Sequence, residues 1–126
     1  MGKSVKAVFD TNILIDYLNG IEDAKIELAQ YRIRQISVIS LIEVLVGATN
    51  AVEENAIRSF LSTFEILELS AEIASQAIVI RKQYRLKIPD AIVYATARTQ
   101  GCILVSRNSK DLKKEWPDIR IPYQVG

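Results

Sequence analysis

Short apolar runs and amphipathic stretches alternate along this chain, and their spacing predicts its secondary structure. Residues 5–9 form an apolar run typical of a buried strand, and a polar break separates them from residues 13–18, where apolar positions recur at helical spacing. Similar runs predict strands at 35–39, 65–69 and 103–105 and a last strand near Ile119. Helical periodicity predicts helices at 21–34, 41–48, 53–64, 70–85 and 91–99.

The alternation of strands and helices indicates the fold class. Such a chain predicts a central, mostly parallel sheet covered by helices on both faces, which is a three-layer α/β/α sandwich. Its 126 residues contain no repeat, linker or low-complexity segment, so we expect one domain spanning 1–126. Functional groups of these sheets gather where the strands end, at their carboxyl edge.

Composition removes several classes of chemistry. The chain has no histidine and a single cysteine, Cys102, which excludes Ser-His-Asp triads, Cys-His dyads, His-based nucleases and the usual zinc sites. Its 16 Lys and Arg nearly balance 15 Asp and Glu, so the net charge of +1 neither favours nor opposes nucleic acid. No apolar run is long enough to span a bilayer, and the first acid, Asp10, comes too early for a signal peptide. We therefore expect a soluble protein of the cytoplasm.

Three acids occupy comparable places in the predicted fold. Asp10 follows the first strand, while Glu43 and Asp90 lie near the starts of two helices. They are far apart in sequence, so only the carboxyl edge of a parallel sheet could unite them. Converging carboxylates repel one another unless a divalent cation neutralises them, and an all-oxygen ligand set suits Mg²⁺ or Mn²⁺.

Each acid also has an ordinary structural explanation. Asp10 could cap the helix at 13–18, Ser40 to Glu43 matches a capping box, and Asp90 could cap the helix that follows it. Glu43, however, is the only charge in an apolar helix, and burying such a charge alone is very costly. The joint occurrence of the three acids favours a shared site over three separate caps.

Four blocks of this sequence occur in the order found in one enzyme family. They are residues 10–18 (DTNILIDYL), 37–47 (SVISLIEVLVG), 88–91 (IPDA) and 104–112 (LVSRNSKDL). Together they resemble the PIN-domain ribonucleases of the VapC toxin type. The resemblance implies an endoribonuclease that depends on Mg²⁺ or Mn²⁺ and is held inactive by a cognate antitoxin. It also implies that Asp10, Glu43 and Asp90 bind the metal.

One position departs from the family's pattern. Many relatives have a fourth acid where this chain has Asn108, and Asp111 follows three residues later. We expect Asn108 to join the catalytic residues as a neutral oxygen ligand or by holding water, and Asp111 to begin a helix or to lie outside the direct ligands. Thr11, Asn12 and Ser106 could support the acids or the water by hydrogen bonds, although Thr11 and Asn12 fit equally well as turn and cap residues.

Two basic clusters are candidates for holding an RNA substrate. One lies around Tyr84 and the other follows the strand at 103–105; in these clusters Arg81, Arg107 and Lys110 are the best candidates for phosphate contacts. The alternative is that the first cluster completes a helix C-terminus and the second is solvated. Tyr84 continues the apolar stripe of its helix, so packing is the role predicted for it.

Two other functions stay open at this level. A phosphotransferase of the haloacid dehalogenase type also begins with a strand and an acid and binds Mg²⁺, but it needs a second acid where this chain has Asn12. A PIN-type module without activity would bind RNA or protein. The three acids oppose that interpretation, whereas Asn108 leaves it open.

The apolar content of three helices points to partners. The helices at 13–18, 21–34 and 41–48 carry more Ile, Leu and Val than one small core readily buries. We therefore expect exposed apolar surface, a homodimer, and a groove for an amphipathic antitoxin segment. The alternative is that a buried parallel sheet consumes these side chains.

Overall fold

Five parallel strands form the centre of the structure, a computed structural model that describes residues 5–124. The ends of the predicted domain, 1–4 and 125–126, lie outside the described residues. The sheet order is β3-β2-β1-β4-β5, so the first strand lies in the middle, with Val8 paired to Gln35 on one side and Leu104 on the other. The strands are β1 (Lys6–Phe9), β2 (Ile33–Ser37), β3 (Glu65–Leu67), β4 (Ile103–Val105) and β5 (Ile119–Arg120).

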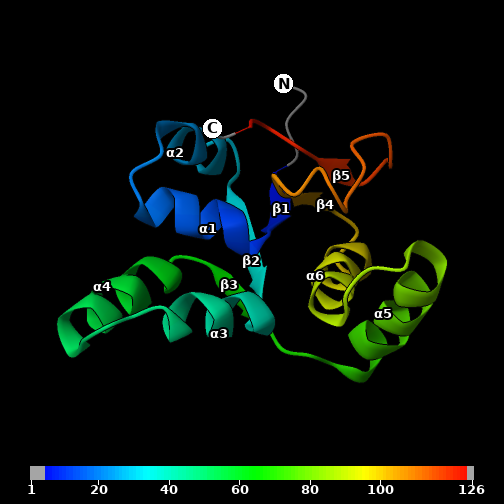
Figure 1. Cartoon of the computed structure of the whole chain (residues 1–126), viewed down its shortest axis with the longest axis horizontal. Coiled ribbons are helices and arrows are strands. Elements are labelled where there is room, and N and C mark those ends of the chain that lie inside the picture. Colours follow the sequence, from blue (N-terminus) through cyan, green and yellow to red (C-terminus); the bar gives the residue numbers. More distant parts are fainter. Residues whose placement is uncertain (1–4, 125–126) are drawn as a thin grey trace.

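Helices cover both faces of the sheet, which confirms the predicted three-layer α/β fold (Figure 1). One layer contains α1 (Thr11–Leu18), α2 (Glu22–Leu28), α3 (Val38–Val46) and α4 (Ala51–Leu61). The opposite layer contains α5 (Ala71–Tyr84) and α6 (Ile88–Thr99). None of the helices in the described part of the chain combines the length and apolar character needed to cross a bilayer.

The two layers form separate cores because successive side chains of a strand point to opposite faces. Ala7 and Phe9 pack among α1 to α4, whereas Val8 packs against α5 and α6. The Phe9 ring meets the rings of Tyr31 and Phe64 edge-on, with centroids 5.4 and 6.2 Å apart. This packing fixes the end of β1, and with it the start of α1.

The predicted helix at 21–34 is wrong in its second half. α2 ends at Leu28, and Ile33 already pairs with Lys6 in the sheet. The backbone N–H groups of Arg32 and Ile33 both donate to the carbonyl of Val5, at 3.0 and 2.7 Å. An apolar residue at position 33 fits both the helical and the strand periodicity. Residue 33 becomes part of a strand because it pairs with β1.

Two helices begin earlier than predicted, one of them because of a side-chain cap. The predicted strand at 35–39 ends two residues early because Ser37 caps α3, its Oγ accepting the N–H of Ile39 at 3.1 Å. α6 begins at Ile88 rather than after Asp90. The predicted cap at Ser70 is confirmed, since its Oγ accepts the N–H of Ile73 at 3.1 Å.

Candidate active site

Asp10 lies at the carboxyl edge of the sheet, directly after β1. Its Oδ1 accepts the N–H of Thr11 at 2.8 Å, so it does cap α1. Its other oxygen accepts the hydroxyl of Ser106 at 2.8 Å. Ser106 follows β4, which pairs with β1, and parallel neighbours end at the same edge. The carboxylate of Asp10 therefore caps α1 and also belongs to the candidate site. Only 6% of this residue is exposed.

Glu43 is connected to this edge through Thr11. The Thr11 hydroxyl donates to Glu43 Oε1 at 2.6 Å and lies 2.9 Å from Ser40 Oγ. The predicted capping box from Ser40 to Glu43 is wrong, because Ser40 is inside α3, one turn before Glu43. Glu43 instead extends from the exposed side of α3 toward the start of α1.

Asp90 completes the acidic group from the opposite layer, in the first turn of α6. Burial raises the pKa of Asp10 to about 6, with smaller contributions from the charges of Asp90 and Glu43, while bonds from Ser106 and Thr11 oppose the rise. The pKa of Asp90 is also raised, first by burial and then by the charges of Asp111 and Glu43, against the effect of Lys87. The structure thus brings these acids within electrostatic reach of one another.

Asn12 holds the loop that follows β4. Its amide nitrogen lies 3.3 Å from Ser106 Oγ and 3.4 Å from Asp10 Oδ2. Its oxygen accepts the backbone N–H of Arg107 at 3.2 Å. Asn12 and Ser106 are therefore joined in one network with Asp10, as expected of supporting residues.

Asn108 and Asp111 form a small closed turn beside the acids. The Asn108 side chain donates to Asp111 Oδ2 at 3.2 Å, and its oxygen accepts the Asp111 N–H at 3.3 Å. The Asn108 N–H donates to Ser106 Oγ at 3.0 Å. Asp111 does not begin an α-helix, because residues 107–118 form turns and loops. The local amide and carboxylate bonds outcompete helix formation here.

The predicted RNA-contacting cations have different surroundings. Arg81 on α5 and Lys110 in the loop after β4 are exposed. The Arg107 guanidinium, in contrast, donates to both carboxylate oxygens of Asp16 at 2.5 and 3.0 Å. Tyr84 packs against Trp116 with centroids 4.1 Å apart, which confirms its predicted packing role.

Asp16 is the residue that sequence reasoning missed. It lies on α1, one turn after Asn12, and only 4% of it is exposed. Besides Arg107, it accepts the hydroxyl of Tyr123 at 2.9 Å. A lone acid on the buried side of an apolar helix was the available signal, because such a charge needs partners.

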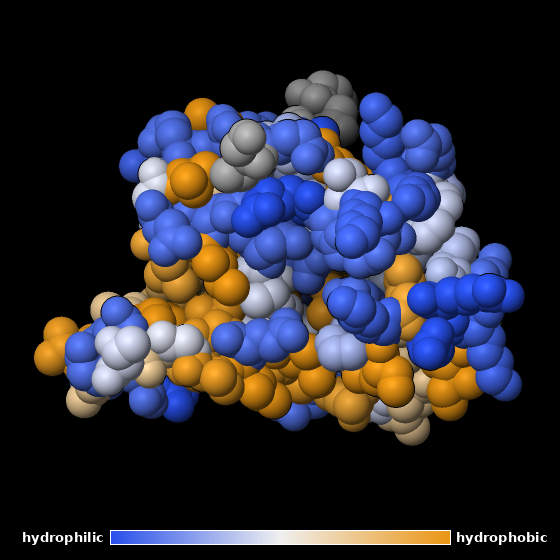
Figure 2. Space-filling view, in the orientation of Figure 1, coloured by the Kyte–Doolittle hydropathy of each residue, from blue (hydrophilic) through white to orange (hydrophobic). Residues whose placement is uncertain are grey.

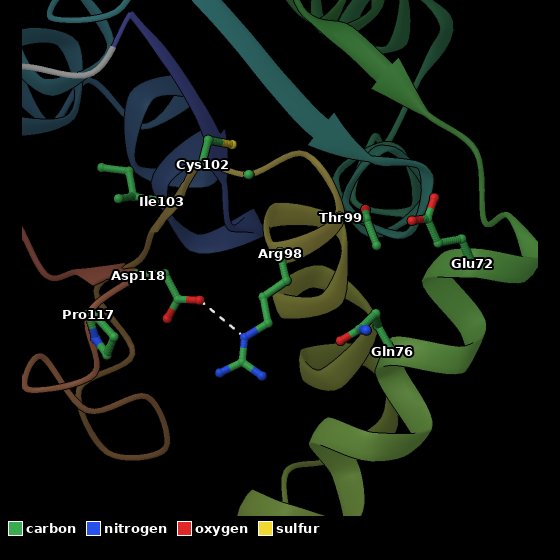
Figure 3. A pocket seen from close by; sticks show the side chains of 9 residues that line it. Glu72, Gln76, Arg98, Thr99, Cys102, Ile103, Pro117 and Asp118 are labelled. Carbon is green, nitrogen blue, oxygen red and sulfur yellow. Dashed lines mark hydrogen bonds and ion pairs between the residues drawn. The ribbon is translucent and has the colours of Figure 1, made fainter.

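A separate cavity of about 580 Å³ lies at the amino end of β4 (Figure 3), whereas Asp10 follows the carboxyl end of β1. Arg98 and Asp118 form an ion pair in its lining, with Nε and Oδ2 3.1 Å apart, and Tyr94 also donates to Asp118. Cys102 at its rim has a raised pKa because of burial. Arg98 and Asp118 are thus paired with each other, and none of the three acids Asp10, Glu43 and Asp90 lines this cavity.

The acidic group fits a divalent cation in its chemistry. Asp10, Glu43 and Asp90 offer carboxylate oxygens, the donors that Mg²⁺ and Mn²⁺ prefer. The pKa of Asp10 is raised mainly by burial and to a smaller extent by the charges of Asp90 and Glu43, and a bound cation would stabilise its ionised form. No three Asp, Glu or Cys side chains within residues 5–124 already approach closely enough to hold a metal by themselves.

Comparison with known proteins adds an independent line of evidence. A solved structure described as a toxin–antitoxin complex from Klebsiella pneumoniae is 42% identical, with a TM-score of 0.89 and coverage of 94% of this chain and 99% of that chain. FitAcB from Neisseria gonorrhoeae is 19% identical, with a TM-score of 0.79 and coverage of 94% and 99%. DNA-bound VapBC from Salmonella typhimurium is 22% identical, with a TM-score of 0.72 and coverage of 93% and 96%. At 19% and 22% identity, the similarities to FitAcB and VapBC show a shared fold and nothing more.

No curated protein matches this chain. The model of the PIN domain family, however, matches residues 7–114, which include Asp10, Glu43, Asp90 and the loop after β4. The resemblance in the four sequence blocks is thereby confirmed, and the chain belongs to the PIN domain family.

Proposed function

We propose that this chain is the toxin of a toxin–antitoxin pair and a metal-dependent endoribonuclease acting in the cytoplasm. The observation that carries the proposal is the buried carboxylate of Asp10, whose pKa is raised to about 6 at an edge where Glu43 and Asp90 also act on it. Perturbed acids of this kind cluster at functional sites. Membership of the PIN family and 42% identity to a chain of the Klebsiella complex support the same function.

The residues of this chain have distinct tasks in the proposed reaction. Asp10, Glu43 and Asp90 would hold Mg²⁺ or Mn²⁺, which stabilises charge on a phosphodiester and lowers the pKa of a water. Ser106 and the Thr11 N–H fix the two oxygens of Asp10, and the Thr11 hydroxyl orients Glu43. Asn108, whose side chain is bonded to Asp111, would contribute a neutral oxygen to the metal or to its water. No histidine is required for these tasks.

Cleavage of RNA by the purified protein tests this proposal. We expect cutting of single-stranded or structured RNA with Mg²⁺ or Mn²⁺ and none with EDTA. Asp90→Asn should abolish cutting and keep the fold, because the amide preserves shape and removes one negative charge. Asp23→Asn, on the exposed surface of α2, is the matched control and should cut at the wild-type rate.

Full activity of Asp90→Asn, or cutting that persists in EDTA, would contradict the metal-dependent reaction. A wild-type protein that binds RNA without cutting would instead support the inactive binding module. The haloacid dehalogenase alternative is superseded by the PIN family match. Asn12, at the position where that reaction needs an acid, is a hydrogen-bond donor to Asp10.

For the antitoxin, we propose the apolar groove between α1, α3 and α4. This cavity of about 430 Å³ is lined mainly by aliphatic side chains: Ile15, Leu18, Val44, Ala56 and Ile57. An amphipathic helix can place its apolar face in such a groove. The antitoxin of the Klebsiella complex is a usable probe. It should bind this chain, and Leu18→Asp should weaken that binding by at least about tenfold, the effect of burying one unpaired charge.

A second apolar surface lies over α3, α5 and the start of α6, along the lower part of the molecule (Figure 2). Its exposed side chains are Ile42, Val46, Ile78, Val79 and Ile88. We propose that a second copy of the chain covers it, because exposed patches of this kind mark interfaces. Sedimentation should show a dimer, and Ile78→Asp should convert it to a monomer without affecting antitoxin binding. A wild-type monomer at high micromolar concentration would refute the dimer.

A further inference from the structure

The loop that carries Asn108 is bonded to α1 through one residue, Arg107, by both its backbone and its side chain. Asn12 accepts the backbone N–H of Arg107, and Asp16 accepts its guanidinium through both oxygens. Asn12 and Asp16 are four residues apart on the same face of α1. A single rigid helix therefore fixes both the backbone and the side chain of Arg107.

The position of Arg107 makes this attachment relevant to the site. It lies between Ser106, which bonds to Asp10, and Asn108, which bonds to Asp111. Movement of the Arg107 backbone would therefore shift the partners of two site acids together. Tyr123, near the C-terminal end of the described chain, also donates to Asp16, at the oxygen that accepts Arg107 Nε.

Stability alone is a weak reason to bury such a pair. Removing two charges from water offsets most of their attraction, and apolar replacements are often equally stable. What a bidentate guanidinium–carboxylate pair provides is a fixed geometry. Asp16 is 5% exposed at its side chain and Arg107 is 33% exposed, so the carboxylate is the buried anchor and the loop is the part held.

We propose that Asp16 is a positioning residue of the active site, which holds the 106–111 loop through Arg107 so that Asn108 and Asp111 stay beside the metal-binding acids. This inference rests on the proposed function of the same site. It also changes the role of Arg107, which acts on the loop and not on RNA phosphates.

The fold contains a matched control for this proposal. Glu27 on α2 is likewise buried, accepts Arg120 through both oxygens at 2.6 and 2.9 Å, and accepts the Tyr31 hydroxyl at 2.9 Å. Arg120 belongs to β5, which carries none of the proposed site residues. The backbone carbonyl of Arg120 accepts the N–H of Ser106 at 3.0 Å, so this control applies to the rest of the loop. At residues 107–111, Glu27→Gln perturbs a pair of the same chemistry without changing the bonds to Asn12 and Asp16.

Amide hydrogen exchange tests the attachment without RNA or metal. Asp16→Asn and Arg107→Met should each speed exchange at residues 106–111 by about tenfold, the factor expected for one lost charge-assisted hydrogen bond. The double variant should show no further increase, since both changes remove the same pair. Glu27→Gln should leave exchange at residues 107–111 unchanged. Arg107→Met changes a partly exposed side chain and so provides the measurement if Asp16→Asn fails to fold.

Cleavage kinetics separate positioning from direct RNA contact. Both single variants and the double variant should lower kcat by a similar factor of about ten while KM for RNA stays within about twofold. Loop exchange equal to wild type in both single variants would overturn the proposal, as would a rise in KM confined to Arg107→Met. If the wild-type protein cuts no RNA, the proposed function fails, and the exchange data still decide whether Asp16 holds the loop.

Discussion

Replacing Asp10 by Asn should make the metal-free protein more stable at neutral pH, although it removes a site residue. The folded pKa of Asp10 is about 6, against 3.8 for an ordinary aspartate, mainly because burial disfavours its charge. A folded pKa above the unfolded value means that ionisation opposes folding. The resulting loss of stability is absent below about pH 4, develops between pH 4 and 6, and is complete above pH 6.

The magnitude follows from the shift. Each pKa unit corresponds to about 1.4 kcal/mol, so the ionised Asp10 lowers the free energy of unfolding by about 3 kcal/mol at pH 7. Asn avoids this loss, but its amide nitrogen cannot accept the Ser106 hydroxyl that Oδ2 accepts at 2.8 Å. That lost bond costs about 1 kcal/mol. We expect a net gain of about 2 kcal/mol at pH 7 and a small loss at pH 4.

Urea denaturation of both proteins in EDTA, repeated from pH 4 to pH 8, measures this difference. From pH 4 to pH 8, the free energy of unfolding of wild type should fall by about 3 kcal/mol relative to that of Asp10→Asn. Asp23→Asn controls for the loss of one negative charge at an exposed place on α2. Parallel curves for wild type and Asp10→Asn across this range would refute the burial argument.

Three further outcomes are expected. Millimolar Mg²⁺ or Mn²⁺ should raise the Tm of wild type by a few degrees but not that of Asp90→Asn, and melting curves that metal leaves unchanged would count against the site. Leu14→Ala, at a fully buried position of α1, should lower the free energy of unfolding by about 3 kcal/mol in urea titrations; a change below about 1 kcal/mol would mean that the core refills the space. Arg85→Gly should stabilise by about 1 kcal/mol because Arg85 ends α5 with φ of 59°, and a loss of stability would show that its side chain contributes more than the strain costs.

The sequence predicts the layers well, and it predicts where Asp10 and Asp90 lie in the fold, because both depend on local signals. Alternating apolar runs mark β1 and β4, and acids directly after strands or at helix starts mark Asp10 and Asp90. The boundary at Ile33 was mispredicted because that side chain fits a helix or a strand, and only pairing with β1 decides. The partnership of Asp16 with Arg107 joins residues 91 positions apart, and no local pattern encodes such a contact.

The two edges of the sheet limit how this protein can associate. β3 has three residues and β5 has two, so each edge offers very few unpaired backbone groups to a strand from another molecule. Edges of this length are poor templates for strand addition, which protects the folded chain against edge-to-edge aggregation. We therefore expect stable assembly through helix surfaces, whose side chains can specify one partner and exclude others.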